Sequence, residues 1–314
     1  MTLPVVVVAG PTASGKSALA LSLAERFDGV VINADSMQLY LELDILTDRP
    51  DPVALARAPH VLYGVVSAAQ RCSAGRWRAM AGAEIEMARR KRRVAIVTGG
   101  TGLYLRALTV GLADIPEIPP AIRRDARSRL TAVGAAGIHA ELTQSDPIMA
   151  ARLHPSDGQR LARAWEVLEA TGQSLADWQD APDQAPPSDW RFFSIRLMPP
   201  REAVYVACDT RFDHMMARGA LEEARALAAL NLDPDLPAMK AVGVPSLIRF
   251  INGEIPLLEA CRLARRDTRR FARRQMAWFR NQLAPTLSIS TQYSKSLNLK
   301  IFPLISEFLL TTDQ

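Results

Sequence analysis

The sequence predicts an α/β fold: a parallel sheet core flanked by helices, with a mainly helical insertion domain. Short apolar runs alternate with helical patterns at the start of the chain, and only helical patterns appear between about 120 and 190. The chain has 314 residues, of which 48% are apolar and 23% charged. That composition is typical of globular proteins, and the length favours more than one domain.

The expected core strands are short, rich in β-branched residues and bounded by turn residues. They span 5–9, 30–34, 94–98 and 192–197. Continuous apolar runs of this length are typical of strands buried on both faces of a sheet. After the first run, Ala20, Leu23, Ala24 and Phe27 follow the helical period, and a second helix is expected over 76–90. This alternation predicts a parallel sheet with helices on both faces.

Four segments are expected along the chain. They are the first part of the core (1–118), a helical insertion (119–190), the completion of the core with basic helices (191–284) and a tail (285–314). A proline-rich connector at 115–120 opens the insertion, and a helix that starts near 157 ends at Gly172 within it. The tail has weak patterning, which predicts no particular element there.

The sequence pattern argues against membrane and disulfide-stabilised classes. No apolar run approaches the roughly 20 residues of a membrane span. The first apolar run lacks the basic stretch of a secretory signal, so we expect a cytoplasmic protein with no membrane association. Cys72, Cys208 and Cys261 are far apart and form no CxxC pair, which favours buried thiols over disulfides or a zinc site.

A glycine-rich loop follows the first expected strand. It consists of Gly10, Pro11, Thr12, Ala13, Ser14, Gly15, Lys16 and Ser17, and it fits the pattern GxxxxGK[ST]. Backbone N–H groups in such a loop point at phosphate oxygens, Lys16 adds positive charge and Ser17 can hold Mg²⁺. An accidental turn is the alternative, but the strand before and the helix after favour a P-loop. A P-loop core that binds a diphosphate or a nucleotide such as ATP is therefore expected.

A carboxylate follows the second strand of this core. P-loop NTPases hold their metal with an Asp at the end of a further apolar strand. Here strand 94–98 runs into Gly99, Gly100 and Thr101 without an acid, whereas strand 30–34 is followed by Asp35. The carboxyl ends of parallel strands face the ligand crevice, which would place Asp35 near the phosphates or the acceptor. Asp is also a favoured helix N-cap, and the residues alone give the two interpretations equal weight.

Positive charge is concentrated late in the chain. Lys and Arg number 38 against 33 acids, a net charge of +5, and eight arginines with one acid lie between 262 and 280. On a helical wheel one stripe holds Arg262, Arg266, Arg269, Arg273 and Arg280, and the opposite side holds Ala264, Thr268, Phe271, Gln275 and Trp278. Guanidinium groups without local acids repel one another, so the stripe favours contact with a nucleic-acid backbone over a solvated surface.

Six motifs occur in order between 10 and 283. They are the P-loop, DSMQ with Tyr40 (35–40), GGTGLY (99–104), HPSD with Gln159, Arg160 and Arg163 (154–163), KAVG (240–243) and TRRFARRQ with Trp278 (268–278). Together they resemble the tRNA dimethylallyltransferase (IPP transferase) family. The resemblance implies transfer of the dimethylallyl group of dimethylallyl diphosphate to the N6 amine of the adenine 3′ of the anticodon in tRNA, with release of diphosphate and with Mg²⁺ as cofactor. The implied partners are the tRNA anticodon stem-loop and the donor, and we expect a monomer.

The resemblance also implies roles for single residues. Asp35 would be the general base, Thr101 would lie beside the reacting groups, and Arg211 would clamp the diphosphate, although the residues alone favour a surface ion pair for Arg211. The P-loop, with Mg²⁺ near Ser17, would neutralise the leaving diphosphate. The positions that match tRNA contacts of the family are Asp35, Ser36, Met37, Gln38, Thr101, Arg123, Gln159, Arg160, Leu161, Ala162, Arg163, Lys240, Gly243, Arg273, Arg274, Gln275, Trp278 and Arg280.

The chain departs from the family pattern in three places. The stretch 41–50 loses two glycines and gains Asp48, Val244-Pro245 replaces a Tyr and a basic residue, and Cys72 stands where Tyr is usual. We expect these changes to alter substrate affinity and the choice of tRNA, and to leave the chemical centre intact.

Three other functions compete with this interpretation. They are a P-loop kinase or NTPase, an isopentenyltransferase that acts on free adenine nucleotides, and an RNA-binding protein without catalysis. The arginine stripe and the helical insertion disfavour the first two, because a small acceptor needs neither.

Overall fold

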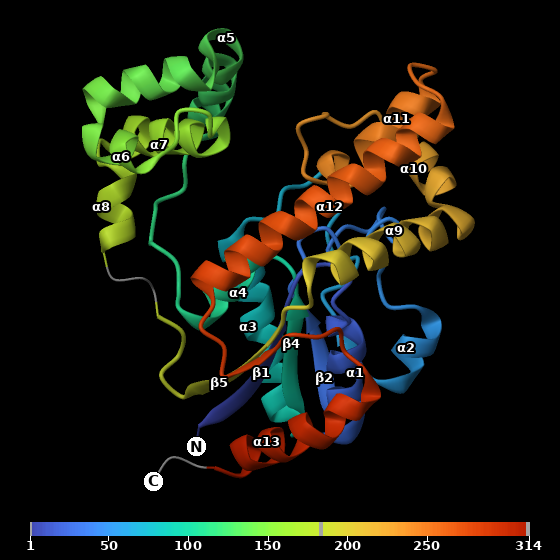
Figure 1. Ribbon diagram of the computed structural model, residues 1–314. Coiled ribbons are helices and arrows are strands. Elements are labelled where there is room, and N and C mark those ends of the chain that lie inside the picture. Colours follow the sequence, from blue (N-terminus) through green and yellow to red (C-terminus); the bar gives the residue numbers. More distant parts are fainter. Residues whose placement is uncertain (1, 182–184, 312–314) are drawn as a thin grey trace. The chain divides into compact units, whose positions relative to one another are not determined.

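The computed structural model describes residues 2–181 and 185–311. Its core is one sheet of parallel strands in the order β3-β2-β4-β1-β5-β6 (Figure 1). The strands are β1 (Leu3–Ala9), β2 (Gly29–Asn33), β3 (His60–Val61), β4 (Val94–Gly99), β5 (Trp190–Leu197) and β6 (Leu287–Ile289). The α/β prediction is therefore confirmed, and each of the four expected strands occurs within a few residues of its expected bounds.

The alternation of side chains along β1 explains why helices cover both faces of the sheet. Val5 and Val7 belong to one buried cluster, and Val6 and Val8 belong to another. The first cluster includes residues of α3 (Ala74–Arg90) and α4 (Gly102–Thr109), and the second includes residues of α1 (Lys16–Arg26). Successive side chains of a strand point to opposite faces, so a run of valines with no exposed surface requires apolar cover on both.

Further helices belong to the same part of the chain as the sheet. They are α2 (Pro52–Arg57), α9 (Arg201–Ala217), α10 (Ala220–Ala229), η1 (Ala238–Lys240), α11 (Val244–Ile251) and α12 (Leu257–Gln282). Helix α12 buries Ala264, Thr268 and Gln275, as its predicted packing side requires, while Phe271 and Trp278 stay partly exposed.

The chain divides into two compact units, of which the first comprises Met1–Thr109 and Pro187–Gln314 and the second spans Val110–Pro186. The helices of the second unit are α5 (Pro120–Ser145), α6 (Pro147–Arg152), α7 (Gly158–Thr171) and α8 (Leu175–Asp180). They enclose a core of their own, in which Ile138, Leu142 and Leu161 are fully buried. Gly134, with φ of 70°, interrupts α5, and Asp146 and Asp157 cap α6 and α7. The proline-rich, acidic stretch 180–189 at the end of the expected insertion lies partly outside the described residues.

The end of the chain forms elements that the sequence pattern does not indicate. Strand β6, the turn η2 (Lys295–Leu297) and helix α13 (Asn298–Leu310) occupy the tail. Phe302 of α13 makes an edge contact with Phe27 of the α1 C-cap at 5.6 Å between ring centroids. Helix α13 is apolar on most of its positions and contains Pro303, so no single apolar stripe marks it in the sequence. Among the described residues, no helix is long and apolar enough to cross a membrane.

The packing of α13 gives a stability prediction. Ile305 has no exposed surface, whereas Leu299 on the same helix is 86% exposed. Ile305→Ala should lower the free energy of unfolding by about 2–4 kcal/mol in urea denaturation, because it leaves a cavity against α1 and the sheet. Leu299→Ala should change it by less than about 0.5 kcal/mol. Equal effects of the two substitutions would mean that α13 does not pack as described.

Candidate active site

Three loops meet at the carboxyl edge of the sheet. The P-loop follows β1, Asp35 and Ser36 follow β2, and Gly100 and Thr101 follow β4. The Thr101 N–H donates to the Ala34 carbonyl at 3.2 Å, and the Ser36 N–H donates to Thr101 Oγ1 at 2.9 Å. Thr101 therefore holds the backbone next to Asp35, and parallel pairing brings together residues that are far apart in the sequence.

Gln275 of α12 joins two of these loops. Its Oε1 accepts the Thr12 N–H of the P-loop at 2.8 Å, and its Nε2 donates to the Gly100 carbonyl at 2.8 Å. The side chain is buried, so both ends of the amide are satisfied by backbone groups and not by water. Gln275 thus fixes the position of the P-loop relative to the loop after β4.

The P-loop has the backbone geometry of an anion cradle. Gly15 (φ 87°) and Ala13 (φ 61°) adopt left-handed conformations, and α1 begins at Lys16. The first N–H groups of a helix have no partners inside the helix, so they are available to phosphate oxygens. Lys16 Nζ donates to the Pro11 carbonyl at 3.4 Å across the loop. The Ser17 side chain is exposed and Ser14 Oγ is buried without a hydrogen-bond partner among the described residues.

Burial lowers the pKa of Lys16 to about 8. The negative charge of Asp35 opposes this effect, and the positive charge of Arg211 adds to it. A buried lysine with a lowered pKa loses its proton at a lower pH than an exposed lysine does, and a bound anion raises the pKa again. The ammonium group of Lys16 is therefore poised to respond to a phosphate ligand.

The chain end supports the P-loop from the outside. The Tyr293 N–H donates to the Ser14 carbonyl at 3.2 Å, and Gln292 Nε2 donates to the Ala13 carbonyl at 3.2 Å. A Cβ added at Gly15 would lie 2.9 Å from Tyr293 Cβ, so this glycine is required for space as well as for its positive φ. Sequence reasoning missed this support, because nothing in the tail marks it as part of a site.

Asp35 is held by the residue that ends β2. Asn33 Oδ1 accepts the Asp35 N–H at 2.7 Å, and Asn33 Nδ2 donates to the carbonyls of Asp35 (3.0 Å) and Leu62 (2.9 Å). Asp35 Oδ1 accepts the Met37 N–H at 3.0 Å, and turns follow instead of a helix, so the helix N-cap interpretation is wrong. Asn33 is fully buried. Its only signal in the sequence is a lone amide at the end of an apolar strand.

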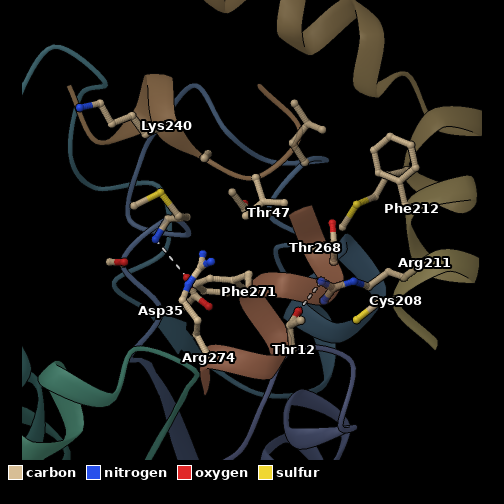
Figure 2. A pocket seen from close by; sticks show the side chains of 16 residues that line it. Thr12, Asp35, Thr47, Cys208, Arg211, Phe212, Lys240, Thr268, Phe271 and Arg274 are labelled. Atoms are coloured by element: carbon tan, nitrogen blue, oxygen red, sulfur yellow. Dashed lines mark hydrogen bonds between the residues drawn. The ribbon is translucent and has the colours of Figure 1, made fainter. Parts of the chain in front are cut away.

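A cavity of about 230 Å³ opens between these groups (Figure 2). Thr12, Asp35 and Arg211 contribute polar groups to it, and Arg211 of α9 donates a hydrogen bond to Thr12 Oγ1. Apolar walls come from Leu46, Phe212, Met215 and Phe271. The cavity can accept a molecule with an anionic end at the P-loop and a small apolar part beside a carboxylate.

The positions expected to touch tRNA divide into two groups. One group lines the same cavity as Asp35: Ser36, Met37, Lys240 and Arg274. The other group lies in the second unit, where Gln159 and Arg160 are exposed. Leu161, Ala162, Gly243 and Gln275 are buried, and their contact with tRNA stays a prediction. Leu161 and Ala162 belong to the core of the second unit, and Gly243 with φ of 97° caps α11.

Other expected tRNA contacts already have partners within the chain. Gln38 Nε2 donates to the carbonyls of Thr47 and Asp48, and the Trp278 indole lies over Gly102, where an added Cβ would be 2.3 Å from it. Lys240 pairs with Asp235 at 2.7 Å, and Arg163 pairs with Glu166 at 3.1 Å. Arg123 is partly exposed, with no ion pair among the described residues.

More arginines of the α12 stripe have acidic partners than the sequence indicates. Three of its members have acidic partners: Arg262 with Glu259 (2.7 Å), Arg266 with Asp267 (3.0 Å) and Arg269 with Asp209 of α9 (2.6 Å). The premise that the stripe lacks neutralising acids is therefore wrong for these three. Arg273 and Arg280 are exposed and form no ion pair with any residue that the structure describes.

Comparison with known proteins gives a consistent result. The family model described as IPP transferase matches residues 38–282. The chain is 54% identical to a tRNA dimethylallyltransferase of Rhodospirillum centenum over 283 residues (90% of each chain), and 51% identical to that of Rhodospirillum rubrum over 312 residues (98% of this chain, 96% of the relative).

Solved structures give the same picture. A tRNA isopentenylpyrophosphate transferase from Bacillus halodurans superposes with a TM-score of 0.69 at 28% identity, covering 98% of this chain and 97% of that chain. A eukaryotic dimethylallyltransferase acting on tRNA superposes with a TM-score of 0.79 at 25% identity, covering 99% of this chain and 81% of that chain.

The lowered pKa of Lys16 predicts a pH dependence of anion binding. Lys16 is mostly protonated below its pKa of about 8 and mostly neutral above it. The ratio of inorganic diphosphate affinities between the unmodified protein and Lys16→Met should therefore fall by up to roughly tenfold between about pH 7 and about pH 9. Isothermal titration calorimetry measures both affinities, and the variant cancels the titration of diphosphate itself. A ratio that stays constant over this range would contradict the prediction.

Proposed function

The chain belongs to the IPP transferase family and transfers dimethylallyl groups to tRNA, and we propose that the cavity between the P-loop and Asp35 is where this reaction takes place. The donor is dimethylallyl diphosphate, and the acceptor is the N6 amine of the adenine 3′ of the anticodon. The observation that carries this proposal is the order of groups in the cavity: anion-binding groups at one side, a carboxylate at another, and apolar walls around them.

The P-loop side stabilises the leaving group. As the C–O bond of the donor breaks, negative charge grows on the diphosphate. The free N–H groups at the start of α1, the Lys16 ammonium and the Arg211 guanidinium are placed to neutralise that charge. Arg211 already donates to Thr12 of the loop, so it needs little rearrangement to bind an anion there.

Asp35 accepts the proton of the amine. The new bond joins the adenine N6 to the first carbon of the dimethylallyl group, the C–O bond to diphosphate breaks, and the proton of N6 passes to the Asp35 carboxylate. Its Oδ1 is held by the Met37 N–H, while Oδ2 has no hydrogen-bond partner among the described residues. Asn33 is a positioning residue in this scheme, because it holds the backbone of Asp35 on both sides.

The apolar walls suit the dimethylallyl group and the base. Leu46, Phe212 and Met215 would surround the short alkyl chain and exclude water from the carbon that reacts. A base must leave its stack to enter such a cavity, and a base in an anticodon loop is already unpaired.

The residues at the P-loop are compatible with Mg²⁺. Ser17 is exposed at the start of α1, and the described residues contain no group of three or more His, Cys, Asp or Glu side chains that could hold a metal by themselves. Ser17 would therefore hold Mg²⁺ together with phosphate oxygens and water. When bound, Mg²⁺ supplies additional positive charge to the leaving diphosphate.

Basic residues outside the cavity would hold the anticodon stem-loop. On α12 these are Arg273 and Arg280. In the second unit they are Arg123 of α5 and Arg160 of α7, with Gln159 and Arg163 on the same helix as Arg160. We also propose that the enzyme acts as a monomer in the cytoplasm, the compartment in which its tRNA substrate is found.

The kinase or NTPase alternative has less support. The residues after β4, Gly100 and Thr101, carry no carboxylate, and Gln275 occupies the space next to Gly100. The loop after β4 thus lacks the Asp that holds the metal of a nucleoside triphosphate in an NTPase.

Substitution of Asp35 tests the chemical assignment. Asp35→Asn should lower kcat for transfer from labelled dimethylallyl diphosphate to bulk tRNA by about 10²- to 10⁴-fold, because the amine loses its proton acceptor. Binding of tRNA should stay within about twofold. Asp44→Asn, an exposed carboxylate outside the cavity, is the matched control. Undiminished transfer by Asp35→Asn would remove Asp35 from the mechanism, and labelled phosphoryl transfer from ATP to tRNA would favour the kinase alternative.

Arg273 and Arg280, two arginines of the α12 stripe that form no ion pair with a described residue, test the tRNA surface. Arg273→Gln with Arg280→Gln should weaken tRNA binding and reduce the slope of log affinity against log salt by about one to two. The double variant Arg262→Gln with Arg266→Gln, whose arginines pair with acids, should change the slope by less. Filter binding at several salt concentrations measures both. Equal slopes for all three proteins would show that this face of α12 is merely solvated.

A further inference from the structure

Asp48 is an acid placed among the cations of the diphosphate site. Its Oδ2 lies 3.6 Å from Arg211 Nη1, and its Oδ1 lies 3.6 Å from Arg218 Nη1 on the C-cap of α9. Its charge also acts on the pKa of Lys16, where it opposes the effect of burial. The proposed mechanism needs Arg211 and Lys16 for the donor, yet it gives Asp48 no role.

The loop that carries Asp48 is fixed rather than free. The Glu223 carboxylate of α10 accepts the N–H groups of Asp44, Ile45 and Leu46 at 2.6, 2.8 and 2.7 Å. Gln38 donates to the Asp48 carbonyl at 3.0 Å. Asp48 adopts φ of 56°, a left-handed conformation that a non-glycine residue keeps only where its surroundings hold it. Its carboxylate is therefore held opposite the two arginines.

Arg211 lies on the boundary between two hollows of the same unit. It lines the cavity of about 230 Å³ that contains Asp35, and it also lines an open cavity of about 620 Å³ with Asp48, His214 and Arg218. Asp48 does not line the first cavity. The guanidinium of Arg211 therefore has an anion on one side, Asp48, and the proposed position of the donor diphosphate on the other.

We propose that Asp48 is an internal counter-anion that competes with the donor diphosphate for Arg211, and thereby sets donor affinity and the release of product diphosphate. The inference rests on the proposed function of the P-loop cavity. With no donor bound, Asp48 neutralises Arg211 and Arg218. A diphosphate must draw Arg211 away from Asp48, and the Asp48 carboxylate repels it throughout, which weakens binding of the product as well as of the donor.

Removal of the Asp48 charge tests this inference directly. Asp48→Asn keeps the size of the side chain, and Asn tolerates a positive φ. The Kd of inorganic diphosphate, measured by calorimetry, should fall by about threefold to tenfold, since both ion pairs of Asp48 are partly exposed. The inhibition constant of diphosphate as product should fall by a similar factor, while the KM for tRNA stays unchanged. Asp48→Gly removes the same charge without strain at this φ and should give the same shift.

The matched control is Asp213→Asn. Asp213 is also an acid that neutralises an arginine: it lies on α9 and pairs with Arg265 of α12. Neither Asp213 nor Arg265 lines either of the two cavities. This variant should leave the Kd of diphosphate unchanged. An equal fall in Kd for Asp213→Asn would mean that net charge alone governs the affinity, which overturns the specific role of Asp48.

Two other outcomes would overturn the inference. An unchanged Kd in both Asp48 variants would show that Asp48 does not compete for Arg211. A higher Kd would show that Asp48 helps to bind the anion, by orienting Arg211 or by holding a cation. Failure of the proposed function gives a different result, because the unmodified protein would then bind diphosphate without transferring a dimethylallyl group to tRNA.

Discussion

The parallel pairing of β2, β4 and β1 is the constraint on which the site depends. Adjacent strands lie about 4.8 Å apart, so the residues that follow β1 and β2 start roughly 10 Å from each other with β4 between them. The P-loop and Asp35 thus stand on either side of the Gly100 loop. That spacing leaves room for a small alkyl group between an anion at the P-loop and an amine at Asp35. Gln275 and Asn33 then fix the loops that the strands bring together.

The second constraint on the site is that acidic side chains offset its cations. Lys16 and Arg211 face the same ligand position, and burial makes the charge of Lys16 costly while the position is empty of anions. The fold contains acids that offset the cations: Asp35 near Lys16, Asp48 at Arg211, and Asp209 and Asp213 of α9 along the arginines of α12. Arg273 and Arg280 of the stripe have no such partner among the described residues, which suits them to bind an external polyanion.

Much of this architecture can be predicted from the residues, and what cannot has a physical reason. The strands and the P-loop are local patterns, because valine runs and a GxxxxGK[ST] loop are recognisable within ten residues. The acids that pair with α12 come partly from α9, about sixty positions earlier, and the Glu223 cradle of the 44–46 loop joins residues almost 180 positions apart. Such pairings depend on tertiary packing, which no local pattern reveals. The elements of the tail could not be predicted for a similar reason. Helix α13 is apolar on most sides, and the segment before it contacts the P-loop through the Tyr293 backbone and the Gln292 side chain.

The central claim is that the P-loop holds the leaving diphosphate while Asp35 faces the group that is transferred. A crystal structure with an unreactive thio analogue of dimethylallyl diphosphate tests it most directly. We expect both phosphorus atoms over the P-loop, within reach of Lys16 and Arg211, and the alkyl group in the cavity that Asp35 lines. An analogue bound at any other place, or bound with its alkyl group turned away from Asp35, would contradict the claim.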